Sequence, residues 1–189
     1  AFLIDPSGKT AGRYDKFHLV PFGEYLPLRR LLPFEKLTAG IGDFTGGPGP
    51  VPIEFEEASI GTLICFESIF PEIARGHVRA GATLLATITN DAWFGRTSAP
   101  YQHFQMSVFR AVENRSFLVR AANTGVSGVI DPVGRVRKTT SLFERVLIVD
   151  EVGLRQGPLT FYGVYGDFFA WGCVLATGVF MVLRKRRVS

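Results

Sequence analysis

Cys65, one of the two cysteines in this 189-residue chain, lies at the end of a short apolar segment, where its thiol could act as a nucleophile. The segment, residues 60–66, has the length and composition of a buried strand, and Pro71 marks the first turn of a predicted helix. A side chain at a strand-to-helix turn faces a cleft, and the backbone N–H groups after it can bind a developing oxyanion. Judged on this segment alone, an inert core cysteine is the commoner alternative.

Three charged residues are of types that could assist a thiol. Lys16 could favour the thiolate and then hold a tetrahedral oxyanion, and Glu24 could fix that lysine by an ion pair. Glu67 comes two residues after Cys65, so along a strand it would point to the same face, where it needs a nearby cation or a catalytic role. Lys16 and Glu24 could equally be ordinary surface charges, because the sequence permits but does not require that they meet Cys65.

The remaining potential ligands form no metal-binding pattern. His18, His77 and His103 are scattered, with no CxxC or HExxH spacing around them. We therefore predict no metal site and no cofactor. Cys173 lies in a segment of different character from that of Cys65, so a disulfide between the two is not expected.

The elements expected to position these residues alternate between strands and helices, which is typical of an α/β fold. The predicted strands are residues 60–66, 83–89, 117–122, 126–130 and 146–152, and the predicted helices are residues 71–82 and 100–115. Residues 4–8 and 130–134 share the pattern I-D-P-x-G, which predicts a hairpin turn in each place. Residues 40–52 are rich in Gly and Pro and are predicted to form a surface loop of the kind that often acts as a lid.

The C-terminal segment has a different composition. Residues 168–183 carry no charge, aromatic residues cluster before and at their start, and four basic residues follow at 184–187. We interpret this as a transmembrane helix with an interfacial aromatic belt and a cytoplasmic tail; a buried core helix is the alternative. The tail also accounts for the net charge of +4, so no basic patch for a nucleic-acid partner is expected on the folded part.

Four segments together resemble the apolipoprotein N-acyltransferases of bacterial envelopes, a membrane branch of the nitrilase, or carbon-nitrogen hydrolase, superfamily. They are residues 14–27 (YDKFHLVPFGEYLP), 64–72 (ICFESIFPE), 89–106 (TNDAWFGRTSAPYQHFQM) and 110–134 (RAVENRSFLVRAANTGVSGVIDPVG). Four long motifs in the order of the family are far more specific than any one of them. The apolar segment with its basic tail is also similar to the last membrane span of that family.

The resemblance implies a partial nitrilase-like α-β-β-α sandwich that lacks its N-terminal part, followed by a transmembrane helix. The implied divisions are a catalytic domain at 1–156, a juxtamembrane linker at 157–166, a transmembrane helix at 167–183 and a basic cytoplasmic tail at 184–189. The catalytic domain would lie on the periplasmic side of the bacterial inner membrane. The general-base glutamate of the family would precede the first residue of this chain, so the chain by itself could be inactive.

The resemblance also implies roles for single residues. Cys65 matches the nucleophile, Lys16 the lysine that stabilises the oxyanion, and Glu24 and Glu67 the two supporting acids. Phe66 stands where the family commonly has Tyr, and a backbone N–H near it would share the oxyanion. The loops around four aromatic residues could line the acyl path or touch the bilayer, although simple loop packing is equally compatible; these residues are Phe22, Tyr25, Trp93 and Phe94.

The implied reaction is the last step of lipoprotein maturation. An acyl chain passes from a phospholipid to a thioester on Cys65, and then to the α-amino group of the N-terminal diacylglyceryl-cysteine of an apolipoprotein. The partners would be the phospholipid donor, the apolipoprotein acceptor and the bilayer. Two alternatives remain open: an amidase of the nitrilase type that hydrolyses a carbon-nitrogen bond, and an inactive membrane-anchored domain.

Overall fold

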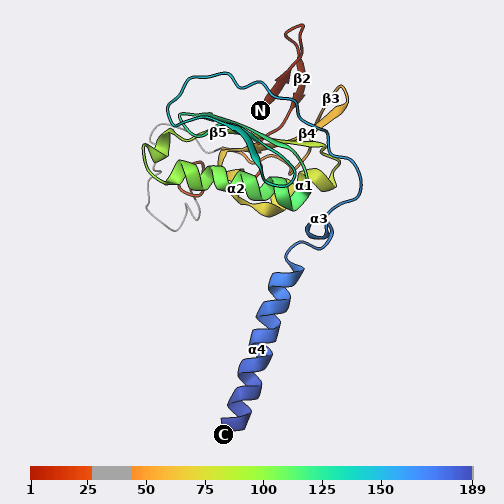
Figure 1. Ribbon diagram of the computed structural model, residues 1–189, viewed down its shortest axis with the longest axis vertical. Helices are drawn as coiled ribbons and strands as arrows, with labels where there is room; N and C mark the ends of the chain where they lie inside the picture. The colour runs from red at the N-terminus through yellow and green to blue at the C-terminus, as the bar shows by residue number, and fades with distance from the viewer. Residues whose placement is uncertain (27–43, 189) are drawn as a thin grey trace.

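The structure is a computed structural model that describes residues 1–26 and 44–188 (Figure 1). Its strands are β1 (Phe2–Ile4), β2 (Thr10–Arg13), β3 (Ile53–Phe55), β4 (Ala58–Ile64), β5 (Leu84–Asn90), β6 (Leu118–Asn123), β7 (Gly128–Ile130) and β8 (Val136–Thr139). Its α-helices are α1 (Pro71–Arg79), α2 (Ala99–Asn114), α3 (Phe161–Tyr165) and α4 (Phe168–Val188), and its 3-10 helices are η1 (Cys65–Ile69) and η2 (Ala92–Phe94). Pro27 and residues 40–43 of the predicted loop lie outside the described residues, and residues 44–52 contain no helix or strand.

Six strands form one mixed sheet in the order β3-β4-β5-β6-β7-β8. The three central strands β4, β5 and β6 are parallel, with Ile64 opposite Ile88 and Ile88 opposite Ala121. The outer pairs are antiparallel, and β1 and β2 form a separate hairpin. Because parallel strands end at the same edge, the segments that follow β4, β5 and β6 meet there, and Cys65 comes directly after β4.

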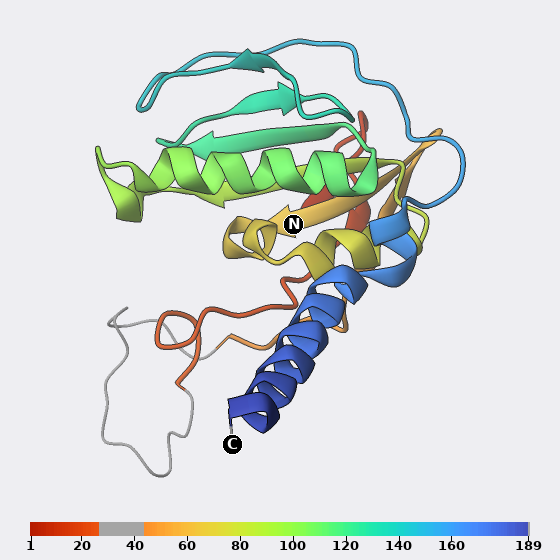
Figure 2. The ribbon, with the colours of Figure 1, turned by 60° about the horizontal axis from the view of Figure 1, so that its bottom comes forward.

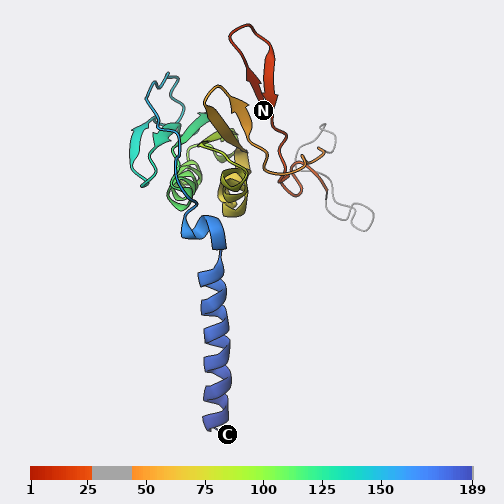
Figure 3. The same ribbon diagram turned by 90° about the vertical axis from the view of Figure 1, so that its right-hand side faces the viewer.

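Helices α1 and α2 lie side by side against one face of the sheet, as Figures 2 and 3 show from two directions. Their apolar sides, including Ile73 and Ala111, pack with Leu63, Leu85 and Leu118 of the central strands to form the core. Gly61 allows α1 to approach β4 closely, because a Cβ atom there would lie 2.8 Å from the Cβ of His77. In the described part of the chain, the six-stranded sheet thus carries a layer of two helices on one face, which agrees with a partial nitrilase-like α/β fold.

Most predicted elements are confirmed with shifted ends, but two predictions are wrong. The predicted strand 60–66 runs instead from Ala58 to Ile64, and Cys65 opens the 3-10 helix η1. Residues 146–152 do not form a strand. Their backbone is held by side chains rather than by a ladder: Arg137 donates to the Glu151 carbonyl oxygen at 2.8 Å, and Lys138 donates to that of Val149.

Both predicted I-D-P-x-G turns are confirmed as hairpins, one joining β1 to β2 and the other joining β7 to β8. In the first hairpin, Asp5 Oδ1 accepts hydrogen bonds from the backbone N–H groups of Ser7 and Lys9. In the second, Asp131 Oδ1 accepts from those of Val133 and Arg135 in the same way. Each turn therefore depends on its aspartate as well as on Pro and Gly.

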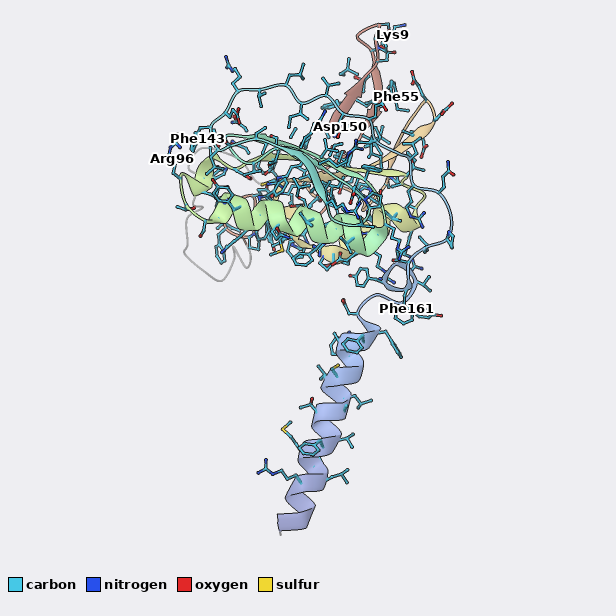
Figure 4. All side chains as sticks on the ribbon, in the orientation of Figure 1. Lys9, Phe55, Arg96, Phe143, Asp150 and Phe161 are labelled. Atoms are coloured by element: carbon cyan, nitrogen blue, oxygen red, sulfur yellow. The ribbon has the colours of Figure 1, made fainter. Side chains whose placement is uncertain are left out.

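The predicted C-terminal helix is present as α4, which projects away from the sheet domain below Phe161 (Figures 1 and 4). It is not a buried core helix, because Trp171 is 72% exposed. Judged by length and hydropathy, none of the helices within residues 1–26 and 44–188 suffices to cross a membrane, so the predicted transmembrane span is not supported. The short helix α3 lies between the sheet domain and α4. It is held by Arg75, whose Nε and Nη2 atoms donate to the carbonyl oxygens of Gly163 and Val164.

Candidate functional site

Cys65 occupies a tight turn at the carboxyl end of the central strand β4. Its backbone has a φ of 55°, a left-handed conformation that is uncommon for any residue other than Gly, Asn or Asp. The thiol is free and half-buried. A non-glycine residue in this conformation persists only where its surroundings hold it, and such residues cluster at functional sites. The geometry therefore presents the thiol at the sheet edge where ligands bind in open α/β sheets.

Glu67, in the same turn, is fully buried and accepts four hydrogen bonds. Its Oε2 atom accepts from the N–H of Ile64 at 2.8 Å, and its Oε1 atom accepts from the N–H groups of Phe17 and His18 at 2.8 and 3.0 Å. The hydroxyl of Tyr14 also donates to Oε1, at 3.1 Å. Bonds to an ionised acceptor are stronger than neutral ones, so together they offset the cost of burying this carboxylate.

Two expectations about Glu67 are therefore corrected. Because Cys65 begins a 3-10 helix, the two side chains do not share one face of a strand. Within the described residues, Glu67 accepts hydrogen bonds from N–H and O–H donors rather than from a cation. The burial of Tyr14, and the negative charge of Glu67 beside it, raise the pKa of the Tyr14 phenol well above its ordinary value, so this hydroxyl stays a donor at neutral pH.

Lys16 and Glu24 form an ion pair beside these contacts. The Nζ atom of Lys16 lies 2.7 Å from each carboxylate oxygen of Glu24, and the lysine side chain is only 11% exposed. The N–H of Val20 also donates to Glu24, which shapes the short loop between them. Lys16 directly precedes Phe17, one of the residues that Glu67 holds, so the backbone of Lys16 is anchored to the turn that carries Cys65.

The aromatic residues expected to bind substrate fall into two groups. Trp93 is 73% exposed, and Phe22 is exposed in a left-handed turn that closes on Tyr25 through a 2.7 Å hydrogen bond. Phe66 and Phe94 are instead half-buried: the Phe66 ring packs edge-on against Phe70, and the Phe94 ring against His103. Trp93 therefore leaves most of its surface open to another molecule, and Phe22 leaves a smaller part open.

Sequence reasoning missed a buried polar cluster behind Cys65. It joins Asp91, His103 and Arg120, each almost fully buried, to the Cys65 turn. Although burial alone would raise the pKa of Asp91, the hydrogen bond with His103 and the charge of Arg120 hold it below its ordinary value. His103 had been considered only as a possible metal ligand; its place in the QHF segment of a predicted helix, facing the end of β4, was the signal that could have identified it.

A metal-binding cluster is not found in the described residues: no three His, Cys, Asp or Glu side chains there are grouped so that they could hold an ion. The chemistry available at this edge is therefore that of a thiol with a lysine, two carboxylates and backbone N–H groups. Such a set can carry out nucleophilic attack on a carbonyl carbon and stabilise the resulting oxyanion.

Comparisons with a protein family and with individual relatives agree with each other. A family model described as carbon-nitrogen hydrolase matches residues 1–155. An apolipoprotein N-acyltransferase of Geobacter metallireducens is 56% identical over the whole chain, and one of Rickettsia prowazekii is 40% identical over 96% of it. The chain spans 36% of the length of each of these two relatives.

Solved structures agree on the fold. A carbon-nitrogen hydrolase from Helicobacter pylori superposes with a TM-score of 0.55 at 20% identity, over 73% of this chain and 50% of that one. The NitFhit protein of C. elegans gives 0.57 at 26% identity, over 75% and 34%. An amidase from Nesterenkonia, with an acetamide moiety added covalently at its active-site cysteine, gives 0.54 at 25% identity, over 75% and 50%.

Proposed function

Because this chain belongs to the carbon-nitrogen hydrolase family, we propose that it provides the nucleophile of an N-acyltransferase and that Cys65 is that nucleophile. The names of the relatives favour acyl transfer to an apolipoprotein over simple hydrolysis. The proposed catalytic domain is residues 1–156, and residues 157–166 link it to the apolar helix.

In the first proposed step, the Cys65 thiolate attacks the ester carbonyl of a phospholipid. A carbon-sulfur bond forms, the ester carbon-oxygen bond breaks, and the lysophospholipid leaves with a proton from the general base. In the second step, the α-amine of an apolipoprotein attacks the thioester, an amide forms and the Cys65 thiolate is released. A thioester is activated toward an amine, which suits this order of events. The proton acceptor in both steps is the glutamate that the family resemblance places before residue 1.

Lys16 is proposed to bind the oxyanion in both steps, together with a backbone N–H near Phe66. Glu24 then keeps the ammonium group of Lys16 oriented through the ion pair. The observation that carries this assignment is the set of hydrogen bonds to Glu67, which ties the segment after Lys16 to the Cys65 turn. These bonds join two segments about fifty residues apart in the sequence, and the packing of the His18 ring on Phe70 adds a second contact between them.

The substrates and the location are proposed from the relatives. We propose a phospholipid donor, an apolipoprotein acceptor and a site on the periplasmic side of the bacterial inner membrane. The exposed rings of Phe22 and Trp93 are proposed to contact the acyl chain or the bilayer. Fractionation of cells that express a tagged protein should recover it with the inner membrane; recovery in the soluble fraction would contradict this location.

The amidase alternative has one specific observation in its favour. The Nesterenkonia amidase shares the fold, and its active-site cysteine is the residue to which the acetamide moiety of fluoroacetamide adds covalently. Both functions pass through an acyl-cysteine, so they differ in the acceptor, which is water in an amidase and an amine in a transferase. Incubation with a short aliphatic amide and measurement of released ammonia would separate the two.

The central test uses the protein in its natural full length, incubated with a phospholipid that carries a labelled acyl chain. We expect a hydroxylamine-sensitive label on the peptide that contains Cys65, and no such label in the Cys65→Ala variant. The Cys173→Ser variant is the matched control and should label normally, because Cys173 lies on the projecting helix α4. A label on a residue other than Cys65 would refute the assignment.

A further inference from the structure

The turn that carries Cys65 is bound at both ends by a single helix. Three side chains at helical spacing on α2, the helix that packs against the sheet in Figure 2, are buried: His103, Ser107 and Arg110. His103 reaches the start of η1, where its Nε2 atom lies 3.2 Å from the carbonyl oxygen of Cys65. Arg110 reaches the end of η1, where its Nη1 atom donates to the carbonyl oxygens of Ser68 and Ile69 at 3.2 and 2.9 Å.

The contact with Cys65 requires a hydrogen on one of the two ring nitrogens of His103. A carbonyl oxygen only accepts, so the Nε2 atom of His103 must carry a hydrogen to bond it. Ser68 takes part in the same arrangement: its hydroxyl donates to the Cys65 carbonyl oxygen at 3.1 Å, and its Oγ atom lies 2.9 Å from His103 Nε2. The Cys65 carbonyl oxygen therefore accepts two hydrogen bonds, one on each lone pair.

The other ring nitrogen of His103 has both an acceptor and a donor beside it. Its Nδ1 atom lies 3.0 Å from Asp91 Oδ1 and 3.0 Å from Arg120 Nη2. A neutral ring protonated at Nε2 accepts from Arg120, whereas a doubly protonated ring donates to Asp91. With its hydrogen on Nε2, the ring keeps the bond to the Cys65 carbonyl oxygen in both of these arrangements.

Asp91 and Arg120 hold the ring from fixed positions. Arg120 on β6 donates from Nη2 to Asp91 Oδ2 at 2.9 Å and from Nε to the carbonyl oxygen of Val126 at 3.2 Å. Asp91, which follows β5, also accepts from Thr89 at 2.9 Å. The cluster thus joins all three parallel strands behind the thiol, β4 through Cys65 just after its end, β5 through Asp91 just after its end and β6 through Arg120 within it.

We propose that His103, held by Asp91 and Arg120, is a positioning residue that fixes the left-handed backbone of Cys65 and so aims its thiol for acyl transfer. The inference rests on the proposed role of Cys65 as the nucleophile. A left-handed cysteine is strained and needs contacts that hold it. Because aiming matters most for the reacting geometry, loss of the His103 contact should lower kcat and leave KM for the phospholipid nearly unchanged.

Two substitutions of His103 test the contacts of its two ring nitrogens separately. In His103→Gln the side-chain amide can reach the position of Nε2 and bond the Cys65 carbonyl oxygen. In His103→Asn the shorter amide reaches only the position of Nδ1 and keeps the contact with Asp91 instead. Neither substitution leaves Asp91 without partners, because Arg120 and Thr89 still bond it.

The test measures the rate of thioester formation on Cys65 in the natural full-length protein, with a labelled phospholipid in detergent micelles. We expect His103→Asn to lower kcat about 100-fold at unchanged KM, and His103→Gln to stay within about 10-fold of the unchanged protein. His77→Gln is the control, since it replaces another buried histidine, on α1, whose ring nitrogens make no hydrogen bond within the described part of the chain. Equal losses in the Asn and Gln variants, or a normal rate in His103→Asn, would overturn the proposal.

Ser68→Ala keeps the test decisive if the His103 variants do not fold. It removes the second donor to the Cys65 carbonyl oxygen and should lower kcat several-fold with a nearly unchanged unfolding temperature; an unchanged kcat would count against the proposal. Failure of the proposed function looks different, because acyl transfer would then survive in Cys65→Ala. Loss of transfer in Cys65→Ala together with a normal His103→Asn variant would reject the positioning role alone.

Discussion

The ammonium group of Lys16 lies 2.7 Å from both carboxylate oxygens of Glu24, in a site where the lysine is largely shielded from water. An ion pair of this kind differs from exposed surface pairs, which contribute little to stability, because the low exposure of Lys16 strengthens the attraction. The pair also orients Lys16, because Glu24 holds the ammonium group of Lys16 where the proposed oxyanion must form.

We first predict the effect of Glu24→Gln. The neutral amide keeps the volume but loses the charge, so Lys16 should no longer be held in one orientation. We expect kcat for acyl transfer to fall about 100-fold, with a smaller change in the free energy of unfolding. Steady-state kinetics and urea unfolding of the same preparations measure the two effects. Glu113→Gln is a matched control, since Glu113 pairs with Arg110 rather than with Lys16; an equal loss of kcat there would point to a general effect of lost charge.

We next predict that Glu67 contributes more to stability than Tyr14 does. Glu67→Gln replaces an acceptor oxygen by an N–H group that faces backbone donors, which should lower the free energy of unfolding by about 3 kcal/mol. Tyr14→Phe removes only one of four donors and should cost about 1 kcal/mol. Urea denaturation of both variants gives the comparison. A larger loss from Tyr14→Phe would mean that ring packing, and not the Glu67 bonds, holds the segment.

His77 gives a prediction about pH. Burial lowers its pKa from 6.5 to about 4 in the folded protein. The unfolded chain therefore binds more protons between these values, so the free energy of unfolding should fall as the pH falls from 6.5 toward 4 and should not change from this cause above 7. In His77→Gln this part of the pH dependence should be absent. Thermal unfolding at a series of pH values, compared between the two proteins, tests it, and parallel curves would refute it.

Asp91 is predicted to be needed chiefly as the partner of a buried cation. Asp91→Asn leaves the charge of Arg120 without its counter-charge and should destabilise the fold by about 3 kcal/mol or more. The double variant Asp91→Asn with Arg120→Met should be less destabilised than the sum of the single variants. Unfolding free energies of the four proteins form the cycle. Simple additivity would show that the two side chains do not depend on each other.

The sequence allowed much of the fold to be predicted, because apolar strands of the right length alternate with amphipathic helices. The strands around Leu63, Leu85 and Leu118 were found for this reason, and they form the core. The strand expected at 146–152 was wrong, since its β-branched residues satisfied the pattern while its backbone bonds the side chains of Arg137 and Lys138. Composition cannot distinguish a paired strand from an extended segment held by side chains.

Prediction of the candidate site from the sequence has a similar limit. Spacing alone placed Glu67 on the same strand face as Cys65, because a 3-10 turn that begins at a left-handed cysteine has no signature in composition. Three of the four partners of Glu67 are backbone N–H groups, which all residues except proline possess, so their residue types could not reveal them. The Asp91, His103 and Arg120 cluster was missed because its members lie on three different elements and meet only when the parallel strands are in register.

The bonds from Glu67 to Phe17 and His18 have a consequence for the order of folding. They join residues 50 and 49 positions apart, so the loop between them must close before the cysteine turn acquires its neighbours. Contacts of such long range form late, after local helices and turns. A newly made chain would therefore carry Cys65 as an ordinary thiol, and its reactivity toward esters would appear only when this long loop has closed.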